Sequence, residues 1–246
     1  MGNKIGIIGG SGLDDPNIIK DPRLIELDTP YGKPSDRLVS GTIGGTEVVV
    51  LARHAKQHSI SPTRVPYRAN IWALKEAGCT QILATTACGS LKAEMAPGDI
   101  VFLDQFIDWT KLRVLTYFEE DVVHTAMAEP FDAALREQCI LTARELKIRH
   151  HEKGTMITIE GPRFSTKAES KMFRLMGADL INMSTVPEVS LAVELKIPYQ
   201  SIAMVTDYDC WKSGEESVSF ELVMQRMAEN AEKVKKLLIR LAEKAV

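Results

Sequence analysis

The sequence predicts an α/β fold, in which a mixed, largely parallel twisted sheet is flanked by helices. Two observations support this prediction. Apolar runs short enough for buried strands alternate with segments of helical periodicity along most of the chain. The 246 residues also contain no Pro-, Ser- or Gly-rich linker, so we expect residues 1–246 to form a single domain. Alternation of this kind places helices on both faces of a sheet.

The elements follow from these patterns in chain order. Apolar runs predict strands near residues 4–8, 37–43, 46–52, 80–86, 99–103, 153–159, 179–183 and 198–206. Helical periodicity predicts helices near residues 66–77, 131–147, 166–176, 186–196 and 217–244. Two helix starts carry the capping-box pattern, with Thr166 three residues before Glu169 and Thr185 three residues before Glu188. The last helix has one apolar stripe, so we expect it to pack along one side.

Composition narrows the class of protein. The chain is 45% hydrophobic and 26% charged with a formal net charge of -3, which is typical of a soluble globular protein without affinity for nucleic acid. No apolar run approaches the length of a membrane span, and the first residues lack a secretory cleavage site, so we expect a cytoplasmic protein. The cysteines and histidines show no metal-ligand spacing. We therefore expect no bound metal and free, mostly buried thiols.

The first predicted strand ends in a glycine turn that contains Ser11. A dinucleotide-binding fingerprint starting at Gly10 would need a third glycine at position 15, where the chain has Asp15. A dinucleotide-dependent oxidoreductase is therefore disfavoured. Two interpretations stay open from the residues alone: a plain structural turn, or a phosphate-binding loop in which Ser11 is one donor.

Polar side chains follow several of the predicted strands, and the carboxyl ends of strands are where ligands gather in such sheets. Hydroxyls, one guanidinium and one imidazole together suit a phosphate anion, although each of them alone is more typical of a helix cap or a packing contact. The residues of this group are Ser11, Arg53, His54, Thr86 and Ser184.

Asp207 and Asp209 form a second polar cluster directly after the last predicted strand. Two carboxylates so close raise one another's pKa, so that one of them could act as a general acid near neutral pH. A turn in which Asp binds its own backbone is the alternative. Phe164 and Met183 lie beside polar groups and could contact a flat ring or a sugar, or belong to the core. An anion site beside an acid suits phosphorolysis, while a phosphatase or a sugar-phosphate enzyme stays open.

The motifs identify a family. Glu160-Gly161-Pro162-Arg163-Phe164-Ser165 resembles the trimeric purine nucleoside phosphorylase family, as do residues 7–13, 51–54, 67–75, 85–91, 97–101, 127–131 and 182–189. These stretches occur in the order of the family, from residue 5 to about residue 225. Residues 206–212 are most similar to the branch of the family that acts on 5'-methylthioadenosine.

The resemblance implies roles for individual residues. Phosphate would be bound by Ser11, Arg53, His54, Thr86, the Ala87 backbone and Ser184. Asp207 would protonate the purine at N7 with support from Asp209. The remaining substrate-binding residues would be Met183 against the ribose, Phe164, Ser165 and Tyr208 around the base, and Phe220, Val223 and Met224 around the 5'-methylthio group. His124 matches a residue that crosses the trimer interface, so the resemblance also implies a homotrimer. It implies no cofactor, because inorganic phosphate is a co-substrate.

Two positions favour adenine over 6-oxopurines. Members of the family that cleave inosine and guanosine have Asn where this chain has Asp207, and Glu where it has Ser165. The expected reaction is therefore phosphorolysis of 5'-methylthioadenosine to adenine and 5-methylthioribose 1-phosphate. The alternatives are a 6-oxopurine or broad-specificity purine nucleoside phosphorylase and a non-catalytic nucleoside-binding protein. Phe220 departs from the small β-branched residue of the branch, so a softened preference for the methylthio group, with adenosine as a secondary substrate, is expected.

Overall fold

A computed structural model describes residues 2–9, 19–55, 58–214 and 218–245. Its strands belong to an 11-stranded sheet. They are β1 (Lys4–Gly9), β2 (Lys20–Ile25), β3 (Leu38–Ile43), β4 (Thr46–Ala52), β5 (Gln81–Ser90), β6 (Ile100–Phe102), β7 (Gln105–Trp109), β8 (His150–His151), β9 (Thr155–Ile159), β10 (Leu180–Asn182) and β11 (Tyr199–Asp207). The helices are η2 (Pro62–Arg64), α1 (Tyr67–Glu76), α2 (Ala133–Glu145), α3 (Lys167–Leu175), α4 (Thr185–Glu194) and α5 (Phe220–Lys244).

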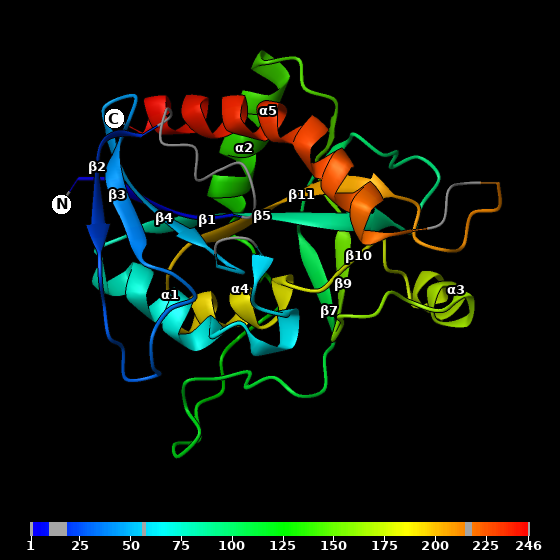
Figure 1. The fold of residues 1–246 in the computed structure, drawn as a ribbon, viewed down its shortest axis with the longest axis horizontal. Helices are drawn as coiled ribbons and strands as arrows, with labels where there is room; N and C mark the ends of the chain where they lie inside the picture. The colour runs from blue at the N-terminus through cyan, green and yellow to red at the C-terminus, as the bar shows by residue number, and fades with distance from the viewer. Residues whose placement is uncertain (1, 10–18, 56–57, 215–217, 246) are drawn as a thin grey trace.

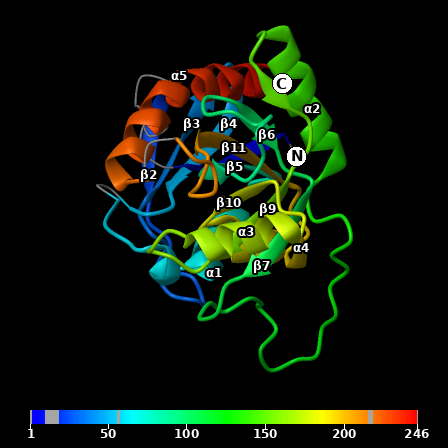
Figure 2. The same cartoon turned by 90° about the vertical axis from the view of Figure 1, so that its right-hand side faces the viewer.

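The helices cover both faces of the sheet, which confirms the predicted α/β class (Figure 1). Helices α2 and α5 lie on one face, and their apolar side chains share a core with β1, β4 and β11. Helices α1 and α4 lie on the opposite face and form a second core with the sheet. Helix α3 packs against β9 and β10, as the perpendicular view also shows (Figure 2). The pairs β1–β4, β1–β5, β5–β11, β7–β9 and β9–β10 are parallel.

Strand β5 carries the feature that creates space for a site. One edge of β5 pairs with β11 along almost its whole length. The other edge pairs with β1 only from Gln81 to Ala84 and with β10 only at Gly89 and Ser90. Within the described residues, the intervening stretch 85–88 therefore has no strand partner on that edge, and neighbouring strands diverge there. A twisted sheet that splits in this way leaves a crevice at strand ends.

The predicted helices and strands agree with the structure to within a few residues at each end, and three strands were missed. Strand β2 has a polar, exposed sequence at the edge of the sheet, so it lacks the apolar signal of a buried strand. Strand β7 is only half-buried, and β8 has 2 residues. Of the predicted apolar stripe on α5, only the part from Val234 onward is buried.

One of the two predicted capping boxes is present and the other was wrong. Thr166 accepts from the Glu169 amide, and Glu169 in turn accepts from the Thr166 amide. At the start of α4 the N-cap is Ser184, without a side-chain cap, and Glu188 points into the core instead. No helix in the described part of the chain is long and apolar enough to cross a membrane.

Candidate active site

A cavity of about 360 Å³ opens beside residues 85–88 of β5. It is lined by residues of η2, β5, β9, β10, β11 and α5 and by Arg53 and His54, which directly follow β4. Most of the residues that were predicted to form the site meet here, namely Arg53, His54, Thr86, Ala87, Phe164, Ser165, Met183, Ser184, Asp207, Asp209, Phe220, Val223 and Met224. They come from stretches up to 171 residues apart, from Arg53 to Met224, so only the fold brings them together.

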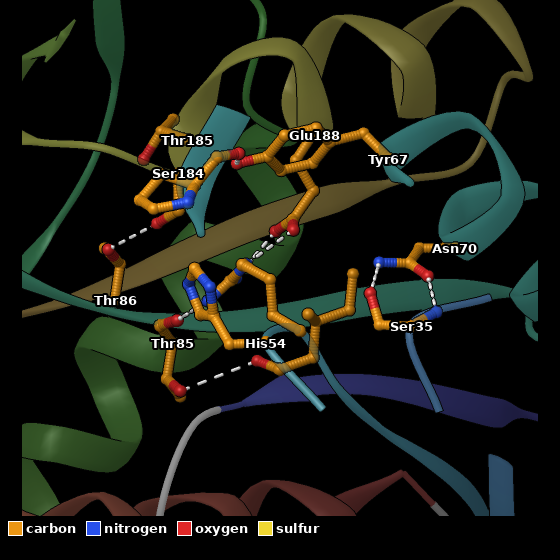
Figure 3. Close-up of polar contacts among 12 residues, drawn as sticks. Ser35, His54, Tyr67, Asn70, Thr85, Thr86, Ser184, Thr185 and Glu188 are labelled. Atoms are coloured by element: carbon orange, nitrogen blue, oxygen red, sulfur yellow. Dashed lines mark hydrogen bonds and ion pairs between the residues drawn. The ribbon is translucent and has the colours of Figure 1, made fainter. Parts of the chain in front are cut away.

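The hydroxyl groups of Thr86 and Ser184 form one corner of the cavity. Their oxygens lie 2.9 Å apart and point toward one another (Figure 3). Asn182 holds this corner, because its Nδ2 donates to Thr86 Oγ1 at 2.9 Å and to Thr185 Oγ1 at 2.7 Å. Thr158 in turn donates to Asn182 Oδ1 at 2.8 Å. The network fixes both hydroxyls without adding charge, which suits an incoming anion.

Arg53 lies at the same corner and is held by a buried carboxylate. Its Nε and Nη2 donate to Glu188 at 2.7 and 2.8 Å, and its Nη1 donates to the Thr85 carbonyl at 2.8 Å. The Tyr199 hydroxyl donates to Glu188 Oε1 at 2.6 Å. Burial opposes the charge of Arg53, but the Glu188 carboxylate outweighs it and raises the pKa of the guanidinium. Because Glu188 binds the guanidinium along its Nε and Nη2 side, N–H groups at the end of the guanidinium can donate to a phosphate oxygen.

His54 contributes an acceptor to the cavity rather than a cation. Its Nδ1 lies 2.8 Å from the Ile60 carbonyl, which can only accept, so Nδ1 carries the proton. Burial and the neighbouring Arg53 charge lower the pKa of His54 to about 4. The neutral ring then presents an unprotonated Nε2, which can accept from a protonated phosphate oxygen. The His58 ring stacks on His54 with centroids 4.3 Å apart.

Asp207 also lines the cavity, at the end of β11. Its Oδ2 accepts from the Thr206 hydroxyl at 2.7 Å, and its Oδ1 accepts from the Asp209 amide at 2.7 Å. Burial raises the pKa of Asp207 and the Asp209 charge adds to this, while the two hydrogen bonds oppose it. Asp209 has φ of +50° and its Oδ1 accepts from Ser165 Oγ at 2.5 Å. A carboxyl group with a raised pKa can hold a proton for transfer.

Two glycines make room for functional side chains. A Cβ at Gly89 would lie 2.8 Å from Asp207 Oδ1 and 3.1 Å from the Ile181 side chain. A Cβ at Gly161 would lie 2.5 Å from Met183 Sδ, and Gly161 also has a φ of +69°, which favours glycine. The positions of Asp207 and Met183 in the cavity therefore depend on these glycines.

Apolar side chains form the remaining wall, mainly from the first turns of α5. Val223, Met224 and Met227 face the cavity beside the more exposed Phe220, whose side chain is 53% exposed. The Phe220 ring lies 6.0 Å from the ring of His58. A wall of this kind suits an apolar group and offers no hydrogen bond to a hydroxyl.

Two of the predicted site residues that the structure describes, Tyr208 and His124, do not line the cavity. Ser11 lies outside the described residues. The Tyr208 hydroxyl donates to the Ala93 carbonyl at 3.4 Å and its ring contacts Trp211, so its side chain lies outside the lining to which its neighbours Asp207 and Asp209 belong. His124 is exposed on the segment 110–132, which extends away from the body of the molecule (Figure 1).

The cavity thus combines hydroxyls and a guanidinium that suit an anion, a carboxyl group with a raised pKa and an apolar wall. Among the described residues, no group of three or more His, Cys, Asp or Glu side chains could hold a metal ion. A family model for the phosphorylase superfamily matches residues 4–243. The chain belongs to the phosphorylase superfamily. It is accordingly a phosphorylase-type enzyme. The corner formed by Arg53, Thr86 and Ser184, called the anion corner below, has donor groups of the kind that bind phosphate.

Relatives of this phosphorylase are similar along nearly the whole chain. It is 59% identical to S-methyl-5'-thioadenosine phosphorylase of Xenopus tropicalis, covering 96% of this chain and 86% of the relative. It is 53% identical to the S-methyl-5'-thioadenosine phosphorylase of Thermofilum pendens, covering 97% of this chain and 90% of the relative.

A solved structure of methylthioadenosine phosphorylase from Schistosoma mansoni in complex with adenine superposes with a TM-score of 0.94, at 45% identity, and covers 98% of this chain and 91% of that chain. A mutant of the adenosine/methylthioadenosine phosphorylase from the same organism, in complex with methylthioadenosine, gives a TM-score of 0.93 at 44% identity, over 98% of this chain and 90% of that one. The fold of this phosphorylase is therefore that of known nucleoside-cleaving enzymes.

Reasoning from the sequence missed the residues whose hydrogen bonds fix Thr86 and Arg53 in position. Asn182 was covered only as part of the family-like stretch 182–189, and Glu188 was assigned to a helix cap. The available signal for Glu188 was an ionisable residue between the apolar residues Pro187 and Val189, because such a residue needs a partner when it is buried. His58, which lines the cavity beside His54, was not assigned a role.

Proposed function

We propose that this phosphorylase cleaves 5'-methylthioadenosine with inorganic phosphate, giving adenine and 5-methylthioribose 1-phosphate. The observation that carries the proposal is the pairing of Asp207, a buried carboxyl with a raised pKa, with an anion corner in the same cavity. The names of the similar enzymes support the choice of nucleoside.

Phosphate binds in the corner formed by Arg53, His54, Thr86, the Ala87 backbone and Ser184, with Ser11 as a further donor. A phosphate oxygen attacks C1' of the ribose as the bond from C1' to N9 breaks. The bound anion stabilises the positive charge that develops on the sugar. The leaving purine takes a proton at N7 from Asp207, and Asp209 holds Asp207 through its amide. Phosphate is a co-substrate, and the reaction needs no cofactor.

The part of the cavity around Asp207 and Ser165 favours a 6-amino purine. Asp207 can accept from the 6-amino group once it has given its proton to N7. Adenine carries no proton on N1, so a short Ser165 beside Asp209 fits where a longer acceptor would be needed for guanine or hypoxanthine. Phe164 lies along the base and Met183 against the ribose.

The apolar wall of α5 receives the 5'-methylthio group. Phe220, Val223 and Met224 exclude water from this group, and a hydroxyl in its place would lose its hydrogen bonds. A small apolar group contributes only about 1 to 3 kcal/mol of discrimination, so adenosine is a secondary substrate.

The proposed enzyme works as a cytoplasmic homotrimer in which His124 reaches the cavity of a neighbouring copy. The support is the resemblance to trimeric nucleoside phosphorylases and the exposure of His124 on an extended segment. Sedimentation velocity at micromolar concentration tests this part. A species of three times the 27.3 kDa chain mass is expected, and a stable monomer contradicts it.

The Asp207→Asn variant tests the role of the acid. It should lower kcat with 5'-methylthioadenosine about 100- to 10,000-fold, because the amide cannot give up a proton, while phosphate binding stays unchanged. Asp179→Asn is the control, since Asp179 pairs with Lys92 and accepts from the Thr155 amide outside the cavity. An Asp207→Asn enzyme within a few-fold of the wild type would remove Asp207 from the mechanism.

A further inference from the structure

Arg113 is buried beside the cavity wall, and its side chain is 1% exposed. Its Nη1 donates to the Tyr67 hydroxyl at 3.2 Å and to the Val186 carbonyl at 2.5 Å. Its Nη2 donates to the carbonyls of Ile159 at 3.3 Å and Glu160 at 2.9 Å. Its Nε lies 3.2 Å from Glu160 Oε1. One guanidinium thus holds several chain segments by their backbone carbonyls, which is the geometry that its planar fork of donors provides.

Glu160 gathers further donors on its carboxylate. Its Oε1 accepts from the Thr63 hydroxyl at 2.7 Å, and its Oε2 accepts from the backbone amides of Lys111 at 2.6 Å and Leu112 at 2.9 Å. Burial alone would raise the pKa of Glu160, but these hydrogen bonds and Arg113 outweigh it and lower the pKa to about 2. The carboxylate is therefore ionised whenever the protein is folded near neutral pH.

The segments that this pair joins are the ones that shape the nucleoside side of the cavity. Thr63 follows the lining residues 60–62, and Glu160 begins the stretch that supplies Phe164 and Ser165. We propose that the Arg113–Glu160 ion pair is a positioning unit, which sets the wall that contacts the purine and ribose. This inference rests on the proposed nucleoside phosphorolysis and adds residues that do not touch the substrate.

The phosphate corner also has supports of its own, so a change at Glu160 should affect the nucleoside far more than phosphate. Asn182 donates to the Thr86 hydroxyl, which is hydrogen-bonded to the Ser184 hydroxyl, and Arg53 is held by Glu188. Asp207 is held by its neighbours Thr206 and Asp209. Arg113 also donates to the Val186 carbonyl, which lies two residues from both Ser184 and Glu188. A substitution at Glu160 keeps that contact, so it shifts the base-stacking wall and leaves the anion donors and the acid in position.

The test is the Glu160→Gln variant, which keeps the shape of the side chain but replaces one acceptor oxygen by an amide group. We expect KM for the nucleoside to rise about ten-fold, and the Kd for adenine measured by calorimetry to rise similarly, because a small shift of a binding wall costs much of its contact energy. KM for phosphate should stay within about two-fold. Thr63→Val removes one hydrogen bond of the same cluster and should give a smaller effect in the same direction.

Asp99→Asn is the matched control. The Asp99 side chain is also buried, at 3% exposed, and accepts from Arg149 and His151, but it lies outside the cavity lining. Asp99→Asn should lower the melting temperature, but it should not raise KM for the nucleoside relative to KM for phosphate. If Glu160→Gln does not fold, Thr63→Val decides alone. Equal rises in both KM values, or none in a folded variant, would overturn the positioning role.

Assays of the wild-type enzyme distinguish a failure of this inference from a failure of the proposed function. Release of base is first measured with 5'-methylthioadenosine, adenosine and inosine, and the KM comparison uses whichever nucleoside is cleaved fastest. Failure to cleave 5'-methylthioadenosine would refute the proposed substrate. A missing effect of Glu160→Gln on a nucleoside that the enzyme does cleave would refute the positioning unit.

Discussion

Glu188 holds the Arg53 guanidinium through two charge-assisted hydrogen bonds of 2.7 and 2.8 Å, and neither side chain is more than 4% exposed. Arg53 would be costly to bury alone, since an unpaired charge in the interior is unfavourable by several kcal/mol. The pair keeps the guanidinium charged, buried and fixed in orientation beside Thr86 and Ser184. The anion corner is therefore preformed before phosphate arrives.

Replacing Glu188 should damage phosphate binding more than nucleoside binding. Glu188→Gln leaves Arg53 without its counter-charge and its side-on partner, so we expect KM for phosphate to rise at least about ten-fold. Glu188→Ala should also destabilise the fold by about 3 to 5 kcal/mol, as measured by chemical denaturation. Tyr199→Phe, which removes only the hydroxyl that donates to Glu188, is the milder comparison. An unchanged phosphate KM in folded Glu188→Gln would contradict this role.

The reaction should slow as the pH rises, if Asp207 is the acid. The protonated form of Asp207 is the active one, and burial raises its pKa above the usual value of 3.8. Above that raised pKa, kcat/KM for 5'-methylthioadenosine should fall about ten-fold per pH unit. The residual activity of Asp207→Asn should lack this limb. A wild-type profile that rises through the same range would argue for a base instead.

The same shift links the stability of the protein to pH. Between 3.8 and the raised pKa, the folded state binds a proton at Asp207 that the unfolded chain has lost, so this group stabilises the fold at low pH and its contribution is lost as the pH rises. Asp207→Asn should therefore gain stability relative to the wild type as the pH increases through that window. Thermal unfolding of both proteins in parallel measures the difference.

Gly89→Ala should impair catalysis by crowding Asp207. The added methyl group would lie 2.8 Å from Asp207 Oδ1, so the carboxyl group must move, and a displacement of this size costs roughly 100-fold in kcat. Gly154→Ala is a control of equal crowding, since its methyl group would lie 2.8 Å from the Val101 side chain, away from the cavity. Comparable losses in both variants would mean a general packing defect.

Phe220→Val should sharpen the preference for the methylthio group. The smaller side chain widens the apolar wall for sulfur and its methyl group, so kcat/KM for 5'-methylthioadenosine relative to adenosine should rise, by up to about ten-fold. Leu24→Ala changes a side chain of similar exposure on β2 and should leave the ratio unchanged. A ratio that falls would show that the large Phe220 ring favours the methylthio group rather than crowding it.

The fold could be predicted well because its elements have strong local signals. Apolar runs located β1, β4, β5 and β11, and periodicity located every α-helix to within a few residues. The edge strand β2 was missed because its residues are polar and exposed. Strand β2 is defined by its pairing with β3, and the paired residues lie between 13 residues apart, for Ile25 and Leu38, and 22 residues apart, for Lys20 and Thr42. No local sequence pattern indicates such a pairing.

The site was predictable only for residues at strand ends. Thr86, Ser184 and Asp207 follow from the rule that ligands gather there. Glu188 was misassigned because it stands three residues after Thr185, which is the spacing of a capping box. Only the position of Arg53 in the fold shows that Glu188 forms a buried ion pair instead. Arg113 and Glu160 act through segments far apart in the chain, so their contacts depend on the complete fold.

The central claim is phosphorolysis of 5'-methylthioadenosine, and the most direct test measures free purine released from 5'-methylthioadenosine, adenosine and inosine, each with and without phosphate. We predict phosphate-dependent release of adenine, fastest from 5'-methylthioadenosine, slower from adenosine and slowest for hypoxanthine from inosine. Release that does not need phosphate would make the protein a hydrolase, and inosine cleavage at a comparable rate would contradict the roles of Asp207 and Ser165.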